Sequence, residues 1–161
     1  MNPVFAEGFG PVCDVNSRVL VLGSFPSVKS RAVGFYYGNP QNRFWRTVCG
    51  YFCEEVPPSV ADKRAFLLRR GIALWDVVAS CEIVGSSDAA IKNETLADIP
   101  SVLSGSKISA ILCNGSKSYG LFAERFPRLL PMAVKLPSTS PANPRFSAEA
   151  WKSEFDKIFK D

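Results

Sequence analysis

Residues 34–45 read GFYYGNPQNRFW and combine aromatic rings with uncharged amides in one short segment. A tyrosine ring can stack on a planar ligand, although packing against the core is the commoner role of aromatic side chains. An asparagine amide can hold a water molecule, because it offers both hydrogen-bond donors and an acceptor. The segment is therefore a candidate pocket for a flat aromatic molecule, with Tyr36 and Tyr37 as stacking partners and Asn39 and Asn42 as water ligands.

The two asparagines differ in the structural role that the sequence predicts for them. Pro40 fits the first position of a helix, which would make Asn39 its N-cap. Asn42 would then lie in the first helical turn, where asparagine is unfavourable. We therefore expect Asn42 to face the pocket and to hold the water molecule, with Asn39 as the second candidate. We expect Phe44 and Trp45 to pack in the core.

Two serine-rich loops offer hydrogen-bond donors to phosphate groups: GSFPS at residues 23–27 and PSTSPANP at residues 137–144. Hydroxyls and backbone N–H groups in such loops bind phosphate oxygens without a cluster of lysines. The alternative is that both are tight turns, which use Ser and Pro for their backbone preferences. Lys29 follows the first loop and is a further candidate for a phosphate contact.

Asp76 lies among apolar residues in the segment LWDVV. A buried carboxylate is costly unless it is paired or accepts a hydrogen bond from a ligand. Two roles therefore remain open for Asp76: it caps the backbone amides of a loop, or it recognises a donor group on the ligand.

The composition narrows the chemistry further. The chain has 161 residues, no histidine and a formal net charge of +4. The absence of histidine excludes Ser-His-Asp and Cys-His catalysis, so carboxylates, amides, hydroxyls, backbone groups or lysines must act. The five cysteines form no CxxC pair, which favours reduced thiols in a cytoplasmic protein. We expect no metal, no cofactor, no signal peptide and no membrane span, and the mild positive charge permits a polyanionic partner.

Apolar segments alternate with segments of helical periodicity along the chain. The predicted strands are residues 18–24, 71–77, 108–115 and 132–138, and the predicted helices lie within residues 44–52, 61–70, 116–126 and 148–160. This alternation predicts a single α/β domain over residues 1–161 with a mainly parallel sheet. The segments after the strands, including a predicted polar loop at 76–93, are rich in Gly, Ser, Asn or Pro. Ligands bind beyond the carboxyl ends of such strands, so we expect one site at that edge.

The segment VLVLGSFPSVKSRAVGFYYGNPQNRFW resembles the first motif region of the uracil-DNA glycosylase superfamily. The resemblance is greatest to its hypoxanthine-DNA (deoxyinosine) glycosylase branch, and the element PxNRFW also resembles the mismatch-specific uracil-DNA glycosylases. GSSDAAIKNE is similar to a later family segment, and LPSTSPANPRF is similar to the second motif. Together these segments extend the resemblance over about residues 9 to 155.

This resemblance implies a four-stranded parallel sheet between layers of helices, a three-layer αβα fold. It also implies a monofunctional DNA glycosylase of base excision repair that flips a deaminated base into a pocket. Such an enzyme hydrolyses the N-glycosidic bond with water and needs no metal. The implied partner is DNA containing deaminated bases, and we expect a monomer.

The resemblance also assigns roles to single residues. Tyr37 matches the aromatic residue that stacks on the flipped base, and Asp76 stands where members that read uracil often have an asparagine. The remaining candidates of the two motif loops are Gly23 and Phe25 at the base, and Ser24, Ser27, Ser138, Thr139 and Ser140 at the DNA backbone. Arg145, after the second motif, is a candidate to bind DNA by filling the hole that the flipped base leaves.

The sequence departs from the family pattern in two places. Phe25 occupies the position of the usual water-activating Asp or Asn, and the second motif lacks its frequent histidine. The hypoxanthine branch is thought to use an asparagine further along, which supports Asn42 and then Asn39.

A carboxylate at Asp76 would accept the N1–H of hypoxanthine, which adenine lacks. The resemblance to the hypoxanthine branch places hypoxanthine before uracil or xanthine. The alternatives are a family member that binds damaged DNA without cutting it and an enzyme that acts on free nucleosides.

Overall fold

A computed structural model describes residues 4–83 and 91–160. Its central sheet has four parallel strands in the order β3-β2-β6-β7. These strands are β2 (Val19–Gly23), β3 (Ile72–Asp76), β6 (Ala110–Asn114) and β7 (Ala133–Leu136). Each falls within one of the four apolar segments predicted as strands, because side chains buried on both faces of a parallel sheet give nearly continuous apolar runs.

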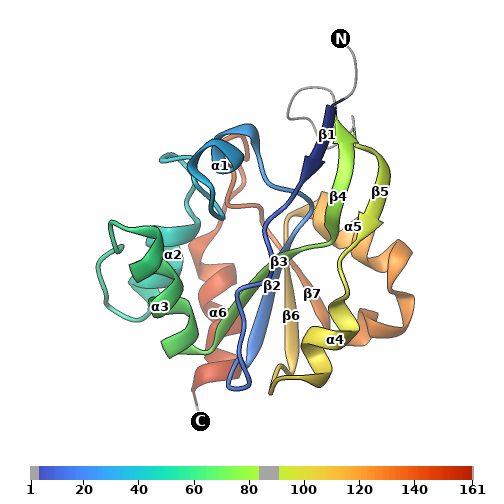
Figure 1. Cartoon of the computed structure of the whole chain (residues 1–161). Helices are drawn as coiled ribbons and strands as arrows, with labels where there is room; N and C mark the ends of the chain where they lie inside the picture. Colours follow the sequence, from blue (N-terminus) through green and yellow to red (C-terminus); the bar gives the residue numbers. More distant parts are fainter. Residues whose placement is uncertain (1–3, 84–90, 161) are drawn as a thin grey trace.

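Helices cover both faces of this sheet, so the predicted three-layer α/β fold is confirmed (Figure 1). One face carries α2 (Phe44–Tyr51), α3 (Val60–Arg70) and α6 (Ala148–Phe159), and the other carries α4 (Ile99–Ser104), α5 (Ser116–Arg125) and the short 3₁₀ helix η2 (Pro127–Met132). Strand β2 serves both layers, since Val21 packs with the first group and Leu22 with the second. None of the helices in the described residues is long and apolar enough to cross a membrane.

A second, antiparallel sheet stands beside the first and was not predicted. It consists of β1 (Val4–Glu7), β4 (Val78–Ile83) and β5 (Lys92–Leu96), in the order β1-β4-β5. The prediction of a polar loop after β3 is therefore wrong for residues 78–83, because Val78, Cys81 and Ile83 bury their side chains against Ala6. Residues 84–90, which include most of the family-like segment GSSDAAIKNE, lie outside the described residues.

The segment between β2 and α2 carries the strand-edge loop and a short helix, α1 (Val28–Val33). Ser27 caps α1, because its Oγ accepts a hydrogen bond from the Ser30 N–H at 3.1 Å. The helix ends at Gly34, whose φ of 87° is a left-handed conformation that glycine adopts without strain. The chain then returns toward the carboxyl edge of the sheet, where it forms one wall of a cavity.

Candidate active site

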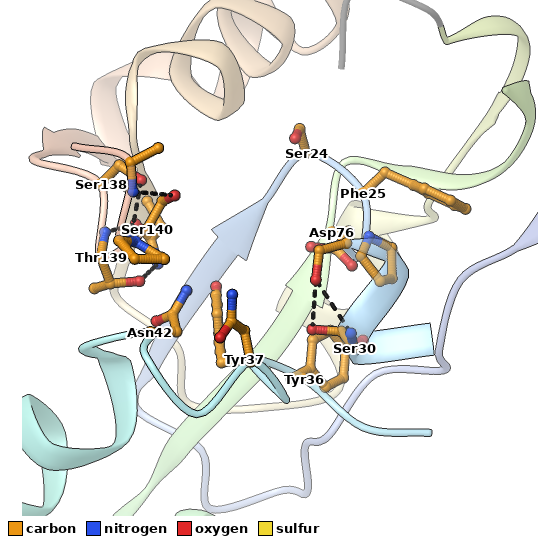
Figure 2. Close-up of a pocket in the computed structure, with 16 residues that line it drawn as sticks. Ser24, Phe25, Ser30, Tyr36, Tyr37, Asn42, Asp76, Ser138, Thr139 and Ser140 are labelled. Atoms are coloured by element: carbon orange, nitrogen blue, oxygen red, sulfur yellow. Dashed lines mark hydrogen bonds between the residues drawn. The ribbon is translucent and has the colours of Figure 1, made fainter. Parts of the chain in front are cut away.

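A cavity of about 380 Å³ lies at the carboxyl edge of the parallel sheet. Figure 2 shows side chains from the segments after β2 and β7 and from Asp76 at the end of β3 around this space, together with the segment that precedes α2. The cavity is lined by most of the candidates that the sequence singled out: Ser24, Phe25, Ser27, Tyr37, Asn39, Asn42, Asp76, Ser138, Thr139 and Ser140. Segments that lie more than 100 residues apart in the sequence meet around this one cavity, at the edge of the sheet where the site was predicted.

Three candidates do not line the cavity. Gly23 lies beside it, directly next to the Asp76 carboxylate. Lys29 is exposed on α1. Arg145 is exposed and lines an adjacent groove that shares Ser138 with the cavity.

Tyr37 forms part of the cavity wall through an aromatic stack. Its ring lies 4.2 Å from the Phe44 ring with an interplanar angle of 20°, so one face of Tyr37 is covered by protein. Its φ of 53° is a left-handed conformation, which is uncommon for a residue other than glycine. Only the uncovered part of the ring is left for stacking on a base.

The Tyr37 hydroxyl is buried and stays protonated at neutral pH. Burial, followed by the charge of Asp76, raises the pKa of Tyr37 above its ordinary value, and the nearby Asn114 amide lowers the pKa by less. Within the described residues the Tyr37 Oη makes no hydrogen bond of good geometry. The hydroxyl is therefore a neutral donor that a ligand in the cavity can use.

Asp76 ends β3 with its side chain buried at the cavity wall. Gly23, its register partner on β2, has no side chain to obstruct it. A Cβ added at Gly23 would lie 2.4 Å from the Asp76 Oδ1 and 3.6 Å from the Tyr37 Oη. The glycine thus permits a carboxylate and a phenol to meet at the bottom of the cavity.

The predicted helix start at Pro40 is wrong, since α2 begins at Phe44. Asn39 and Asn42 instead make short side-chain turns that compete with helical hydrogen bonds. The Asn39 Oδ1 accepts from the Gln41 N–H at 3.0 Å, and the Asn42 Oδ1 accepts from the Phe44 N–H at 2.9 Å. The argument that ranked Asn42 above Asn39 therefore fails, because both side chains make the same kind of turn and both line the cavity.

The serine-rich loop after β7 is held in place by its own backbone. The Ser138 Oγ accepts from the Ser140 N–H at 3.1 Å, and the Ser140 Oγ accepts from the Ala142 N–H at 3.2 Å. Thr139 is buried between them and exchanges two hydrogen bonds of 3.0 Å with the Asn114 amide. Ser138 and Ser140 keep their hydroxyl hydrogens for a ligand, whereas Thr139 has a structural contact.

Residues 9–161 match the family described as the uracil DNA glycosylase superfamily. The chain belongs to this superfamily. It is 36% identical over 159 residues to the hypoxanthine DNA glycosylase of Methanosarcina acetivorans. The aligned residues cover 96% of this chain and 98% of that protein. It is 35% identical over 160 residues to the protein of the same name from Methanosarcina barkeri, with the same coverage.

The fold has a solved counterpart in the superfamily. The solution NMR structure of a candidate uracil DNA glycosylase from Methanosarcina acetivorans superposes with a TM-score of 0.78 at 35% sequence identity, and the match covers 97% of each chain. The resemblance inferred from the motif segments is thereby confirmed, and with it the enzyme class, a DNA glycosylase.

The structure shows what replaces the usual first-motif acid of the superfamily. Phe25 occupies that position, and its ring lies 5.8 Å from the Arg31 guanidinium and packs against the second sheet. Asp76 is the only carboxylate among the residues that line the cavity. Across the described residues we find no cluster of three or more Cys, Asp or Glu side chains that suits a metal ion.

Three residues of this superfamily member support the cavity and were not assigned that role from sequence. Ser30 is buried, and its Oγ accepts from the Gly38 N–H at 3.0 Å, which ties α1 to the Tyr37 segment. Asn114, the last residue of β6, holds Thr139 through its side-chain amide. Arg43 donates to the carbonyl oxygens of Ser140 and Asn143 at 3.2 Å and 3.0 Å. Ser30 and Arg43 lie in the segment that resembles the first motif region, whereas no motif pointed to Asn114.

Proposed function

We propose that this protein is a monofunctional DNA glycosylase that removes hypoxanthine from DNA, with uracil and xanthine as secondary substrates. One observation carries the proposal. A single cavity joins a buried carboxylate, a buried neutral phenol and two asparagine amides, beside a loop that offers serine hydroxyls. The cavity volume is within the range of about 300–1,000 Å³ that is common for small-ligand sites, and both curated relatives carry the name hypoxanthine DNA glycosylase.

The base is recognised by its pattern of donors and acceptors. Hypoxanthine carries a hydrogen on N1 and an oxygen on C6, whereas adenine has an acceptor at N1 and a donor at C6. The Asp76 carboxylate accepts the N1–H, and the Tyr37 hydroxyl donates to the oxygen. Adenine would present the opposite pattern to both groups, so it would leave buried polar atoms unpaired at a cost of about 1–3 kcal/mol for each group.

Hydrolysis breaks the bond between C1′ of the sugar and N9 of the base. The sugar passes through an oxocarbenium-like state and the bonding electrons leave with the base. Water attacks C1′, its hydroxyl stays on the sugar, and the proton that it releases is balanced by protonation of the departing base. An asparagine amide is too weak a base to remove the proton of that water, so its contribution is to position the water. We assign this task to the Asn39–Asn42 turn, because each Oδ1 keeps a second lone pair beyond the one that it gives to the backbone.

The substrate is held by its phosphates as well as by its base. Ser138 and Ser140 offer hydroxyl donors beside the cavity, and Ser24 lies across it (Figure 2). Ser27 also lines the cavity. All five cysteines are free, which supports a cytoplasmic location.

The deciding experiment is an incision assay on duplex and single-stranded oligonucleotides that carry one deoxyinosine. We expect a strand break after alkaline treatment, weaker breaks with uracil or xanthine, and none with adenine. Free inosine serves as a second substrate in the same assay. The proposal fails if none of the three deaminated bases is released, which would favour a protein that binds damage without cutting. Release of hypoxanthine from inosine but not from DNA would favour a nucleoside enzyme.

A further inference from the structure

Two further cavities flank the base-binding cavity, one on each side. A groove of about 660 Å³ shares Ser138 and Ser140 with the base-binding cavity. A smaller cavity of about 240 Å³ shares Tyr37, Asn39 and Asn42 with it. The groove and the smaller cavity share no lining residue with each other, so the three form a row in which the base-binding cavity connects the other two.

Charge is distributed unevenly along this row. The middle cavity is lined by one charged side chain, Asp76, which repels phosphate. Cations line both flanks: Lys135 and Arg145 in the groove, and Arg46 and Lys63 in the smaller cavity. A nucleotide whose base enters the middle cavity has a phosphate on each side of its sugar, so a strand laid along the row meets cations before and after the flipped base.

The side chains of Arg46 and Lys63 are available to such a strand. Arg46 is exposed on α2, and within residues 4–83 and 91–160 neither cation forms an ion pair. The Lys63 Nζ lies 5.3 Å from the centre of the Trp45 ring. This cation–π contact fixes the ammonium group at the cavity without neutralising its charge.

We propose that Arg46 and Lys63 bind the phosphates of the damaged strand on one side of the flipped nucleotide. The strand then runs from the groove at Arg145, over the base-binding cavity, to the cavity between α2 and α3. This assignment rests on the proposed function, because it takes its direction from a base held in the middle cavity. It adds a second phosphate-binding flank to the serine-rich loop that the motifs pointed to.

The test compares the salt dependence of DNA binding. The probe is a duplex with one tetrahydrofuran abasic analogue, which has no base to remove, and Kd is measured between low and moderate salt. Each lost phosphate contact lowers the slope of log K against log salt by about 0.9. Arg46→Gln and Lys63→Gln are each expected to lower the slope by this amount, and the double variant by about twice as much, with a loss of affinity of about tenfold or more at low salt.

The matched control is Arg128→Gln. Arg128 is exposed on η2, which precedes β7 and therefore lies at the opposite edge of the parallel sheet. This variant carries the same change in net charge, so it reports the part of the effect that comes from charge alone. The proposal is overturned if the slopes of Arg46→Gln and Lys63→Gln equal that of Arg128→Gln.

A second arm locates the contact on the strand. Single phosphates around the lesion are replaced one at a time by uncharged methylphosphonates. We expect one position on one side of the lesion to weaken the native protein but not the double variant, and an equal loss in both proteins at every position would contradict the proposal. If native protein fails to cut deoxyinosine DNA, the proposed function fails, while the salt slopes still decide whether these two cations bind DNA.

Discussion

Asn39 and Asn42 both use the side-chain oxygen to accept a backbone N–H, at Gln41 and Phe44 respectively. Aspartate keeps that oxygen and therefore the turn, whereas alanine removes it. Asn39→Ala and Asn42→Ala are compared. We expect the variant that lacks the water-holding residue to lower the single-turnover rate on deoxyinosine DNA by about 100-fold or more. Asn→Asp at the same residue should leave the melting temperature unchanged and report the contribution of the amide alone. If both alanine variants lower the rate by less than about tenfold, the attacking water is not held by this turn.

Gly23 allows the Asp76 carboxylate to lie directly against the backbone of β2, because glycine has no side chain. In Gly23→Ala the new Cβ would lie 2.4 Å from the Asp76 Oδ1, far inside van der Waals contact, so the carboxylate must move. We expect kcat/KM on deoxyinosine DNA to fall by about tenfold or more, because the displaced carboxylate no longer meets N1–H. Gly120→Ala is the control, since no atom lies within 4 Å of its added Cβ. Equal activity in the two variants would show that Asp76 does not need its observed position.

At the scale of elements, Arg43 joins the two loops that face each other across the cavity. Its N–H donates to the Thr139 carbonyl at 3.0 Å, its guanidinium donates to two more carbonyls of the serine-rich loop, and its charge lies 5.1 Å from the Phe146 ring. One nitrogen, Nη1, makes both side-chain contacts, and Arg43→Lys keeps the charge but ends in an ammonium on a shorter side chain. We expect KM for DNA to rise by about tenfold, with a smaller change in kcat, because the loop that holds the backbone loses its anchor.

A structural role alone would lower stability without this split. The thermal melting curve of Arg43→Lys is therefore recorded beside the kinetics, with Arg128→Lys as the control for the same substitution at an exposed arginine. A fall in kcat with unchanged KM would contradict the assignment and would place Arg43 in the chemical step.

Strands could be predicted from the sequence where both of their faces are buried. The four strands of the parallel sheet are buried on both faces, and their short apolar runs, such as VLVLG in β2, indicate strands directly. Strand β4 escaped prediction because its burial pattern is irregular and its sequence, VASCEI, lacks the alternation of a half-buried strand. The start of α2 escaped prediction because two Asx turns compete with the helix at residues that otherwise read as its N-cap and first turn.

At the scale of the molecule, parallel topology explains why the site was located from sequence and its contacts were not. Parallel strands bring their carboxyl ends to one edge, so the segments after β2, β3, β6 and β7 must meet there. The contacts that shape the cavity join distant residues through side-chain amides and carbonyls, as Asn114 does with Thr139. No local pattern encodes such a pairing. The ranking of Asn42 above Asn39 failed for a different reason, because both side chains accept from the backbone N–H two residues further on.

The absence of histidine from the whole chain predicts the pH dependence of catalysis. A single-turnover rate limited by an imidazole would change near pH 6.5, and this chain has none. Burial and the charge of Asp76 raise the pKa of Tyr37, and burial raises the pKa of Cys113, a neighbour on β6, to about 12. A raised pKa keeps each group protonated further into the alkaline range, so the Tyr37 hydroxyl remains a donor throughout.

We expect the rate on deoxyinosine DNA to vary by less than about twofold from pH 6.5 to 8.5. Tyr37→Phe should lower the rate equally at every pH in this range, because it removes a neutral donor. An alkaline decline below pH 9 that Tyr37→Phe abolishes would show that the phenol ionises there and would contradict its role as a protonated donor to the base.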